Sequence, residues 1–180
     1  MMEWLNQPKS WQHEGQTIRV RSEGQTDFWR LTHDGGIRDN GHFYYRQVSG
    51  NFVAEVALRG EFRDLYDQAG LMIRLSPEYW IKCGIEYVDQ TPYASVVVTK
   101  NHSDWSVLPL ANQESPVTFR IQRTNALLEF FLVRTETEYQ LIRQTTFTDE
   151  PTLAVGLMIA SPKGDGFAAE FSDWKIQPST

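Results

Sequence analysis

The sequence has little cysteine, no long apolar run and no cluster of basic residues. The single cysteine, Cys83, excludes a disulfide bond within the chain. No apolar stretch is long enough to span a bilayer, and the N-terminus MMEWLNQPKSWQ lacks the basic-then-apolar pattern of a signal peptide. We therefore expect a cytoplasmic protein without a membrane partner. A net charge of −6 without any Lys/Arg block argues against nucleic acid as a partner.

Helical periodicity is also missing, and short alternating segments take its place. Helix is expected at most as single turns at Glu3–Gln7 or Leu65–Asp67, while aromatic residues, 13% of the chain, favour strands. Ten or more strands without helices predict an all-β, antiparallel two-sheet β-sandwich that forms one domain over residues 1–180. Outside Asp67–Glu86, the expected strands are Thr17–Arg21, Asp27–Leu31, His42–Val48, Phe52–Gly60, Ala94–Lys100, Thr118–Arg123, Leu127–Arg134, Tyr139–Gln144, Leu153–Ala160 and Phe167–Ile176.

The segment Asp67–Glu86, DQAGLMIRLSPEYWIKCGIE, shows the clearest alternation. Successive residues of a strand point to opposite faces of the sheet. One face is apolar and is expected in the core; it carries Ala69, Leu71, Ile73, Leu75, Ile81, Cys83 and Ile85. The other face is polar and carries Gln68, Arg74, Trp80, Lys82 and Glu86 beside two glycines. An exposed aromatic ring beside charged and amide groups indicates a binding surface for a polar ligand, since sugars stack on such rings.

Three polar segments are expected to form the rims of this face. The loop Thr32–His42 offers His33, the strand start offers Asp67, and the expected loop Asn101–Ser106 offers Trp105. Turn chemistry is the alternative for these segments, and Asp67 in particular could cap a turn. The two histidines of the first loop match neither a zinc motif nor a calcium loop, so no metal and no cofactor are expected.

Several blocks resemble a known family. FWRLTHDGGIRDNGHFYYRQVSGNF, LYDQAGLMIRL, YWIKCGIEY and SVVVTKNHSDWS are similar, in this order, to uncharacterised cytoplasmic domains labelled "regulation of enolase-like". The resemblance runs from about Asp27 to Trp174. It implies a jelly-roll sandwich similar to the concanavalin A-like lectins and glucanases, and it implies no established reaction.

Binding is favoured over catalysis. We expect a module that binds a carbohydrate or a phosphorylated or acidic sugar derivative on its concave sheet face. Trp80 would stack on the ligand, Lys82 and Glu86 would hydrogen-bond it, and Gln68, Arg74, His33, Asp67 and Trp105 would line its edges.

Two alternatives stay open. The first is a glycoside-processing enzyme with Glu86 as acid or base, which needs a second carboxylate from Asp67 or Asp104 because the strand carries only one. The second is a protein-interaction module that regulates a metabolic enzyme, as the family label suggests. It would require an exposed apolar patch instead of a polar groove.

Overall fold

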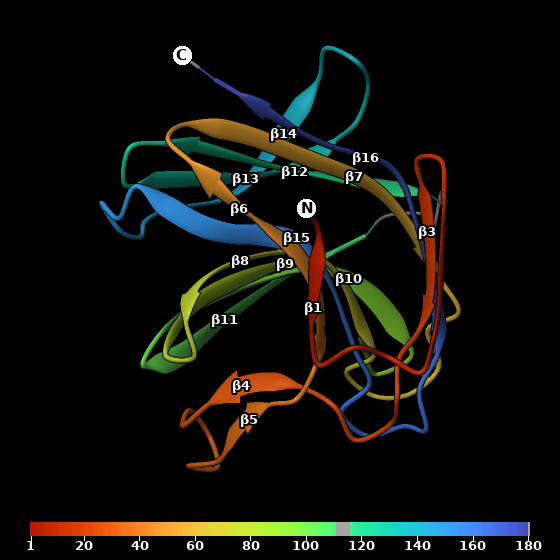
Figure 1. Ribbon diagram of the computed structural model, residues 1–180. Coiled ribbons are helices and arrows are strands. Elements are labelled where there is room, and N and C mark those ends of the chain that lie inside the picture. Colours follow the sequence, from red (N-terminus) through yellow and green to blue (C-terminus); the bar gives the residue numbers. More distant parts are fainter. Residues whose placement is uncertain (111–115, 180) are drawn as a thin grey trace.

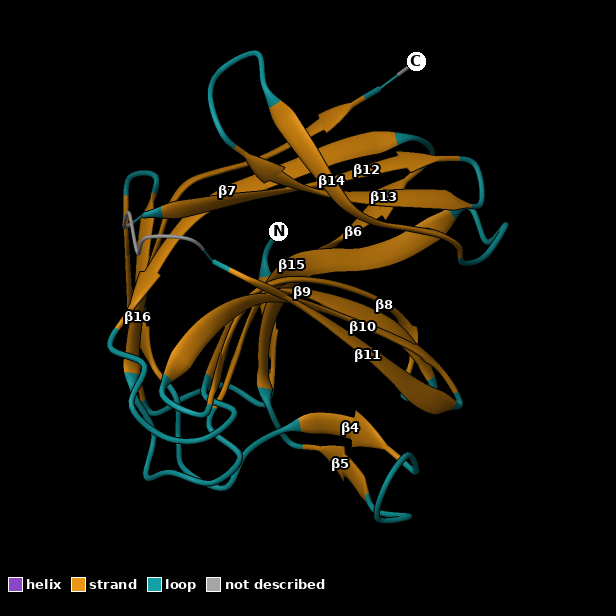
Figure 2. Ribbon diagram, turned by 180° about the vertical axis from the view of Figure 1, so that it is seen from behind, coloured by secondary structure: helices purple, strands orange, loops and turns teal. Residues whose placement is uncertain are grey.

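The computed structural model describes residues 1–110 and 116–179 and contains two seven-stranded antiparallel sheets packed face to face (Figure 1). The described residues include no helix, which agrees with the missing helical periodicity (Figure 2). Accordingly, none of the described segments is a helix long and apolar enough to cross a membrane. The predicted all-β sandwich is confirmed.

The first sheet, sheet A, has the spatial order β1 (Glu3–Leu5), β6 (His42–Ser49), β15 (Thr152–Ala160), β8 (Gln68–Ser76), β9 (Tyr79–Val88), β10 (Thr91–Lys100) and β11 (His102–Pro109). The second, sheet B, has the order β14 (Tyr139–Thr146), β13 (Leu127–Val133), β12 (Val117–Thr124), β7 (Phe52–Gly60), β16 (Ala168–Pro178), β3 (Thr17–Arg21) and β2 (Ser10–Glu14). A separate two-stranded sheet is formed by β4 (Phe28–Arg30) and β5 (Ile37–Asp39).

The main core lies between the two large sheets. It contains the predicted inward set of β8 and β9 (Ala69, Leu71, Ile73, Ile81, Cys83 and Ile85), packed with Phe52, Leu58, Phe119 and Phe130 of sheet B. Leu75 departs from the prediction and is 39% exposed, because the pairing of β8 with β9 is irregular between Arg74 and Ser76. The Cys83 thiol is fully inside this core, and burial raises its pKa. It is therefore the inert structural thiol that its place on the apolar face predicts.

A second apolar cluster lies on the opposite face of sheet A. It consists of Phe28, Phe43, Met72, Trp80, Val97, Ala154 and Met158. Figure 2 shows the strands of sheet A arching over the β4–β5 hairpin, and Phe28 of this hairpin is part of the cluster. The outer face of sheet A is thus covered in its middle by a segment of the same chain.

The N-terminal residues take strand positions instead of the helical turn expected at Glu3–Gln7. Here β1 pairs with β6, and Trp4 stacks on Tyr44 at a centroid distance of 4.8 Å. Trp11 of β2 packs edge-on against Trp4 at 5.4 Å. These rings bring β1 and β6 of sheet A together with β2 of sheet B and pack against the main core. The local polarity of the segment concealed this role, since its apolar residues are few and widely spaced.

Candidate functional site

The predicted polar residues of β8 and β9 share the outer face of sheet A. The strand register places Gln68 opposite Glu86 and Arg74 opposite Trp80, with Lys82 between the two pairs. The alternation of the sequence therefore predicted correctly which side chains lie on one face. Whether these side chains are open to a ligand depends on what covers the face.

Trp80 is not available for stacking, because its side chain is fully buried. The ring packs edge-on against Phe28 at 6.1 Å, and its indole N–H donates to the carbonyl of Pro77 at 3.2 Å. The expectation of an exposed Trp80 was wrong because the β4–β5 hairpin folds back onto the strand face. A sugar would have to displace Phe28 to reach this ring.

Arg74 holds the hairpin in place. Its guanidinium donates two hydrogen bonds to the Asp39 carboxylate, at 2.6 and 2.7 Å, and lies over the Phe28 ring at 5.9 Å. At the other end of the hairpin, the Arg30 amide donates to the Ser103 hydroxyl at 3.0 Å. A bidentate guanidinium–carboxylate pair is a strong, directional contact. Arg74 is therefore engaged by other residues of the protein and is not available to a ligand on an open surface.

Lys82 and Gln68 are also satisfied within the chain. The ammonium group of Lys82 donates to Gln68 Oε1 at 2.5 Å and to the Phe28 carbonyl at 2.8 Å, and it lies 3.4 Å from Asp27. The Gln68 amide donates to the carbonyl of Tyr66 at 3.1 Å. A buried ammonium needs such partners to avoid a large desolvation cost. These two residues form a buried polar network under the start of the hairpin.

Asp67 caps a turn, which was the alternative interpretation of this residue. It is fully buried, and one carboxylate oxygen accepts the backbone amides of Arg63 and Asp64 at 3.0 and 2.9 Å. The other oxygen accepts the Ser161 hydroxyl at 2.6 Å. Placing Asp67 at the rim of the ligand face was therefore wrong: it belongs to the turn before β8.

The loop Thr32–His42 contains the short strand β5 and divides into structural and exposed residues. His42 is buried, accepts the Glu23 amide on Nε2 at 3.0 Å and contacts the Asn6 carbonyl through Nδ1. His33 is exposed at the tip of the hairpin, with a positive φ of 76°. A ligand role for His33 stays a prediction. Within residues 1–110 and 116–179, no group of three His, Cys, Asp or Glu side chains is placed to hold a metal ion.

Glu86 and Trp105 meet at the part of the face beyond the hairpin. The indole N–H of Trp105 donates to Glu86 Oε2 at 2.8 Å, and the Ser95 hydroxyl donates to the same oxygen at 2.6 Å. Burial raises the pKa of Glu86, while the Lys82 charge and these two donors act to lower it. The Trp105 side chain is 39% exposed and packs edge-on against Tyr66 at 6.1 Å. An oriented, accessible ring thus lies beside a buried carboxyl group.

Trp105 belongs to a strand, although the sequence suggested a loop at Asn101–Ser106. The turn is confined to Asn101, which has a positive φ of 65°, and β11 begins at the next residue. Pairing of Trp105 with Val97 places its ring on the outer face of sheet A. Asp104 points away and pairs with Arg143 at 3.0 Å.

Two buried glycines of β8 and β9 lie next to this cluster. Gly70 and Gly84 lie opposite one another, and Gly84 is also paired with Ser95. A Cβ atom on Gly84 would lie 2.0 Å from the Ala69 carbonyl oxygen, so no side chain fits at this point. The two glycines let the strands approach closely, and both are buried.

Ser95, Tyr66 and Asp39 were not predicted as site residues. Ser95 could have been found, since it occupies an outward position in the alternating segment Ala94–Lys100. Tyr66 lies in the connection before β8 and Asp39 ends β5, and only the three-dimensional fold brings them to β9 and β8. A hollow of about 210 Å³ lies beside Arg74. It is lined by Tyr45, Gln47, Arg74, Ser76 and Thr152 among others.

Comparison with known proteins shows the family and the fold. The model of the family described as "Protein of unknown function (DUF1349)" matches residues 4–179. The chain is 33% identical over 173 residues to "Regulation of enolase protein 1" of Saccharomyces cerevisiae, covering 96% of this chain and 87% of that protein. A crystal structure of a functionally unknown protein from Saccharomyces cerevisiae has a TM-score of 0.95 at 32% identity and covers 99% and 97% of the two chains.

More distant solved structures show the fold alone. A GH43 protein from Bacillus licheniformis, the BlXynB mutant, has a TM-score of 0.76 at 18% identity over 99% of this chain and 37% of its own. The carbohydrate binding module CBM66 from Bacillus subtilis has a TM-score of 0.61 at 12% identity over 97% and 94% of the two chains. The concanavalin A-like jelly-roll sandwich implied by the sequence blocks is confirmed. By its match over residues 4–179 and its similarity to the yeast protein, the chain belongs to the DUF1349 family of proteins of unknown function.

Proposed function

We propose that the protein binds a small polar ligand, a carbohydrate or sugar derivative, on the outer face of sheet A where Glu86, Ser95 and Trp105 meet. The observation that carries the proposal is the half-exposed Trp105 ring, held by a hydrogen bond of 2.8 Å to a buried carboxylate. An exposed indole in a fixed orientation offers its face to the C–H groups of a sugar. Trp105 thus takes the stacking role that the sequence suggested for Trp80.

The chemistry around the ring suits hydroxyl groups. The hydrogen bonds that Glu86 accepts in the described part of the chain go to Oε2. The second oxygen of the same carboxylate can accept a hydroxyl of a ligand, as carboxylates have room for about four hydrogen bonds. Tyr66 borders the same area through its edge-on contact with Trp105. Fold neighbours that include a carbohydrate binding module support this choice of ligand class by analogy only.

A thermal-shift screen with neutral, acidic and phosphorylated sugars tests the proposal. A ligand at about a hundred times its Kd stabilises the native state by about 2.7 kcal/mol. For a chain of this size, this stabilisation corresponds to a rise in Tm of roughly 5–10 °C. We expect Trp105→Ala to abolish the shift and Trp105→Phe, which keeps a ring without the indole N–H, to reduce it.

Tyr139→Ala is the matched control for this screen. Tyr139 is an aromatic residue of similar exposure, 41% against 39%, on the outer edge of sheet B. The ligand-induced shift should be unchanged in this variant. No shift with any sugar, or a shift with a neutral sugar that Trp105→Ala leaves intact, would overturn the proposal.

A glycoside-processing activity has weaker support in the structure. Glu86 has the raised pKa of a general acid. The two carboxylates considered as its partner are engaged elsewhere, Asp67 in its turn and Asp104 with Arg143. Turnover assays on any sugar that binds would detect such an activity directly.

Regulation of a metabolic enzyme is the second candidate function. It is favoured by the name of the yeast relative, which refers to enolase regulation, and by identity of 33% over nearly the whole chain. Measurement of enolase activity with and without the purified protein tests it, and an unchanged activity counts against it. The cytoplasmic location expected from the sequence also stays a prediction, which cell fractionation can test.

A further inference from the structure

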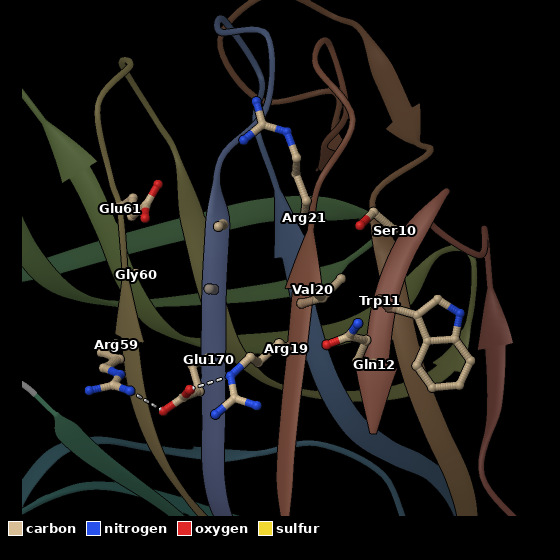
Figure 3. A pocket seen from close by; sticks show the side chains of 12 residues that line it. Ser10, Trp11, Gln12, Arg19, Val20, Arg21, Arg59, Gly60, Glu61 and Glu170 are labelled. Atoms are coloured by element: carbon tan, nitrogen blue, oxygen red, sulfur yellow. Dashed lines mark hydrogen bonds and ion pairs between the residues drawn. The ribbon is translucent and has the colours of Figure 1, made fainter. Parts of the chain in front are cut away.

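A larger hollow lies on the other side of the molecule, on the outer face of sheet B. It has a volume of about 670 Å³ and is lined by residues of β2, β3 and β16 and of the end of β7 (Figure 3). This volume is in the range of sites that hold small molecules. None of its residues belongs to the site proposed above.

One row of side chains across these strands is charged and linked. The register aligns Gln12, Arg19, Glu170 and Arg59. Glu170 accepts from Arg19 Nε at 2.8 Å with one oxygen and from Arg59 at 2.6 Å with the other (Figure 3). The single carboxylate therefore fixes two guanidinium groups, whose backbones are about 10 Å apart because β16 runs between them. Both arginines stay half-exposed, with side-chain exposures of 50% and 57%.

The neighbouring row is open in its centre. Ala168 is aligned with Arg21 and Ser10, and its carbonyl accepts the Glu61 amide on the other side at 2.8 Å. The small Ala168 side chain leaves space between Arg21 and Glu61, and Figure 3 shows Arg21 on the same side of the sheet as the linked pair. Arg21 donates to the Gly166 carbonyl at 3.2 Å, which anchors its guanidinium at the edge of the hollow.

The charge of this hollow differs from that of the whole protein. Three arginines and two glutamates line it, and Glu14 beside it pairs with Arg19 Nη1 at 3.3 Å, so these charges sum to zero, whereas the chain as a whole carries −6. Each guanidinium has five N–H donors, and the contacts described above use only some of them. The planar donor fork matches carboxylate and phosphate oxygens, while Ser10, Gln12 and Glu61 offer partners for hydroxyl groups.

From this geometry we infer a second binding site, which takes a small ligand that carries one phosphate or carboxylate group on a polyhydroxyl body. The anionic group would bind over Ala168, between Arg21 and the Arg19–Arg59 pair. Ser10, Gln12 and Glu61 would contact hydroxyls of the ligand. The negative net charge of the chain disfavours large polyanions and leaves a single anionic group acceptable.

Isothermal titration calorimetry on the full chain tests this site with four probes: inorganic phosphate, glucose 6-phosphate, glucuronate and glucose. We expect binding of the probes that combine an anionic group with a sugar body, weakened by added salt, and no binding of glucose here. Arg21→Gln and Arg59→Gln should each weaken binding roughly tenfold, because each removes a charge-assisted contact worth about 1.4 kcal/mol. Arg134→Gln, which removes an exposed arginine bonded to Gln140, should leave the Kd within about twofold.

Three results would overturn the inference. The first is failure of glucose 6-phosphate and of glucuronate to bind. The second is binding of glucose to the Trp105→Ala variant as tight as that of glucose 6-phosphate, which would mean that the arginines do not select the anionic group. The third is binding that survives in the Arg21→Gln/Arg59→Gln double variant and is lost in Trp105→Ala, which would assign the anion to sheet A. The relative affinities of glucose 6-phosphate and glucuronate then show which anionic group the arginines prefer.

Discussion

The outer faces of the two sheets carry similar kinds of residue and use them differently. On sheet A, Arg74 and Lys82 are covered by the β4–β5 hairpin and are 9% and 4% exposed. On sheet B, Arg19 and Arg59 lie at the surface and hold a shared carboxylate. The same alternation of polar and apolar residues therefore produces an internal anchoring layer on one sheet and a solvated charged surface on the other. What distinguishes them is a segment distant in sequence that folds over only one face.

The largest effect is expected from Phe28, which anchors the hairpin in the second apolar cluster. Phe28→Ala removes a fully buried ring and should lower the free energy of unfolding by about 3–5 kcal/mol. Ile37→Ala in the same hairpin is the control, because Ile37 is 57% exposed and should cost less than about 0.5 kcal/mol. Urea unfolding of the two variants measures the difference, and equal costs would show that sheet A is not capped in this way.

The Arg74–Asp39 pair should come next. Asp39→Ala leaves the buried Arg74 guanidinium without its carboxylate and should cost about 2 kcal/mol. Asp34→Ala breaks a comparable pair with Arg38 in the same hairpin, but both side chains are about 40% exposed. Its cost should be clearly smaller than that of Asp39→Ala in the same unfolding measurement, because the pair is exposed to solvent. A reversal of this order would contradict the anchoring role of Arg74.

Glu86 should make the stability of sheet A depend on pH. Its folded pKa is raised, so the native state holds a proton that the unfolded chain has already lost at pH values above the ordinary pKa of 4.5. This group therefore contributes a loss of stability as pH rises from 4.5 through the raised pKa. Glu86→Gln keeps an acceptor for Ser95 and Trp105 and removes this pH-dependent contribution to the free energy of unfolding.

The comparison of Glu86→Gln with the unchanged protein should be made across this pH range. The two should differ by less than about 1 kcal/mol in acid, where both side chains are neutral. The variant should gain in relative stability as the pH is raised toward neutrality. Parallel stability curves, measured by chemical unfolding at each pH, would mean that Glu86 titrates normally.

The smallest effect is expected on sheet B. Arg59→Gln breaks an ion pair with Glu170 whose arginine is 57% exposed, and it should cost no more than about 0.5 kcal/mol. The same variant is expected to weaken anion binding, which separates function from stability at this position. A cost above about 1.5 kcal/mol would make the pair a structural element like Arg74–Asp39.

The sequence predicted the sandwich and the orientation of its central strands well. Alternation along Asp67–Glu86 placed Leu71 and Ile81 in the core between the sheets, because apolar side chains leave water most readily. It also placed Trp80 and Arg74 on the correct face, but their expected exposure was wrong, since the hairpin that covers them is brought there by long-range contacts such as Arg74 with Asp39.

Local sequence signals were ambiguous for two of the three predicted rim segments, those of Asp67 and Trp105. Asp67 sits at the start of a strand, where either a ligand or a turn could use its carboxylate, and the turn amides of Arg63 and Asp64 take it. Trp105 was placed in the expected loop Asn101–Ser106, yet the turn needs only Asn101 and β11 begins at the next residue. The contact of Trp105 with Glu86, nineteen residues away, depends on the pairing of three strands and is not encoded by spacing alone.

The most direct test of the account observes the Trp105 indole N–H itself. The protein has six tryptophans, and Trp105→Phe identifies the corresponding signal in a ¹⁵N-resolved NMR spectrum. During titration with a sugar that raises Tm, we predict a shift of the Trp105 indole signal while that of the buried Trp80 stays in place. A titration that moves the Trp80 signal and leaves that of Trp105 unchanged would contradict binding at the Glu86–Trp105 site.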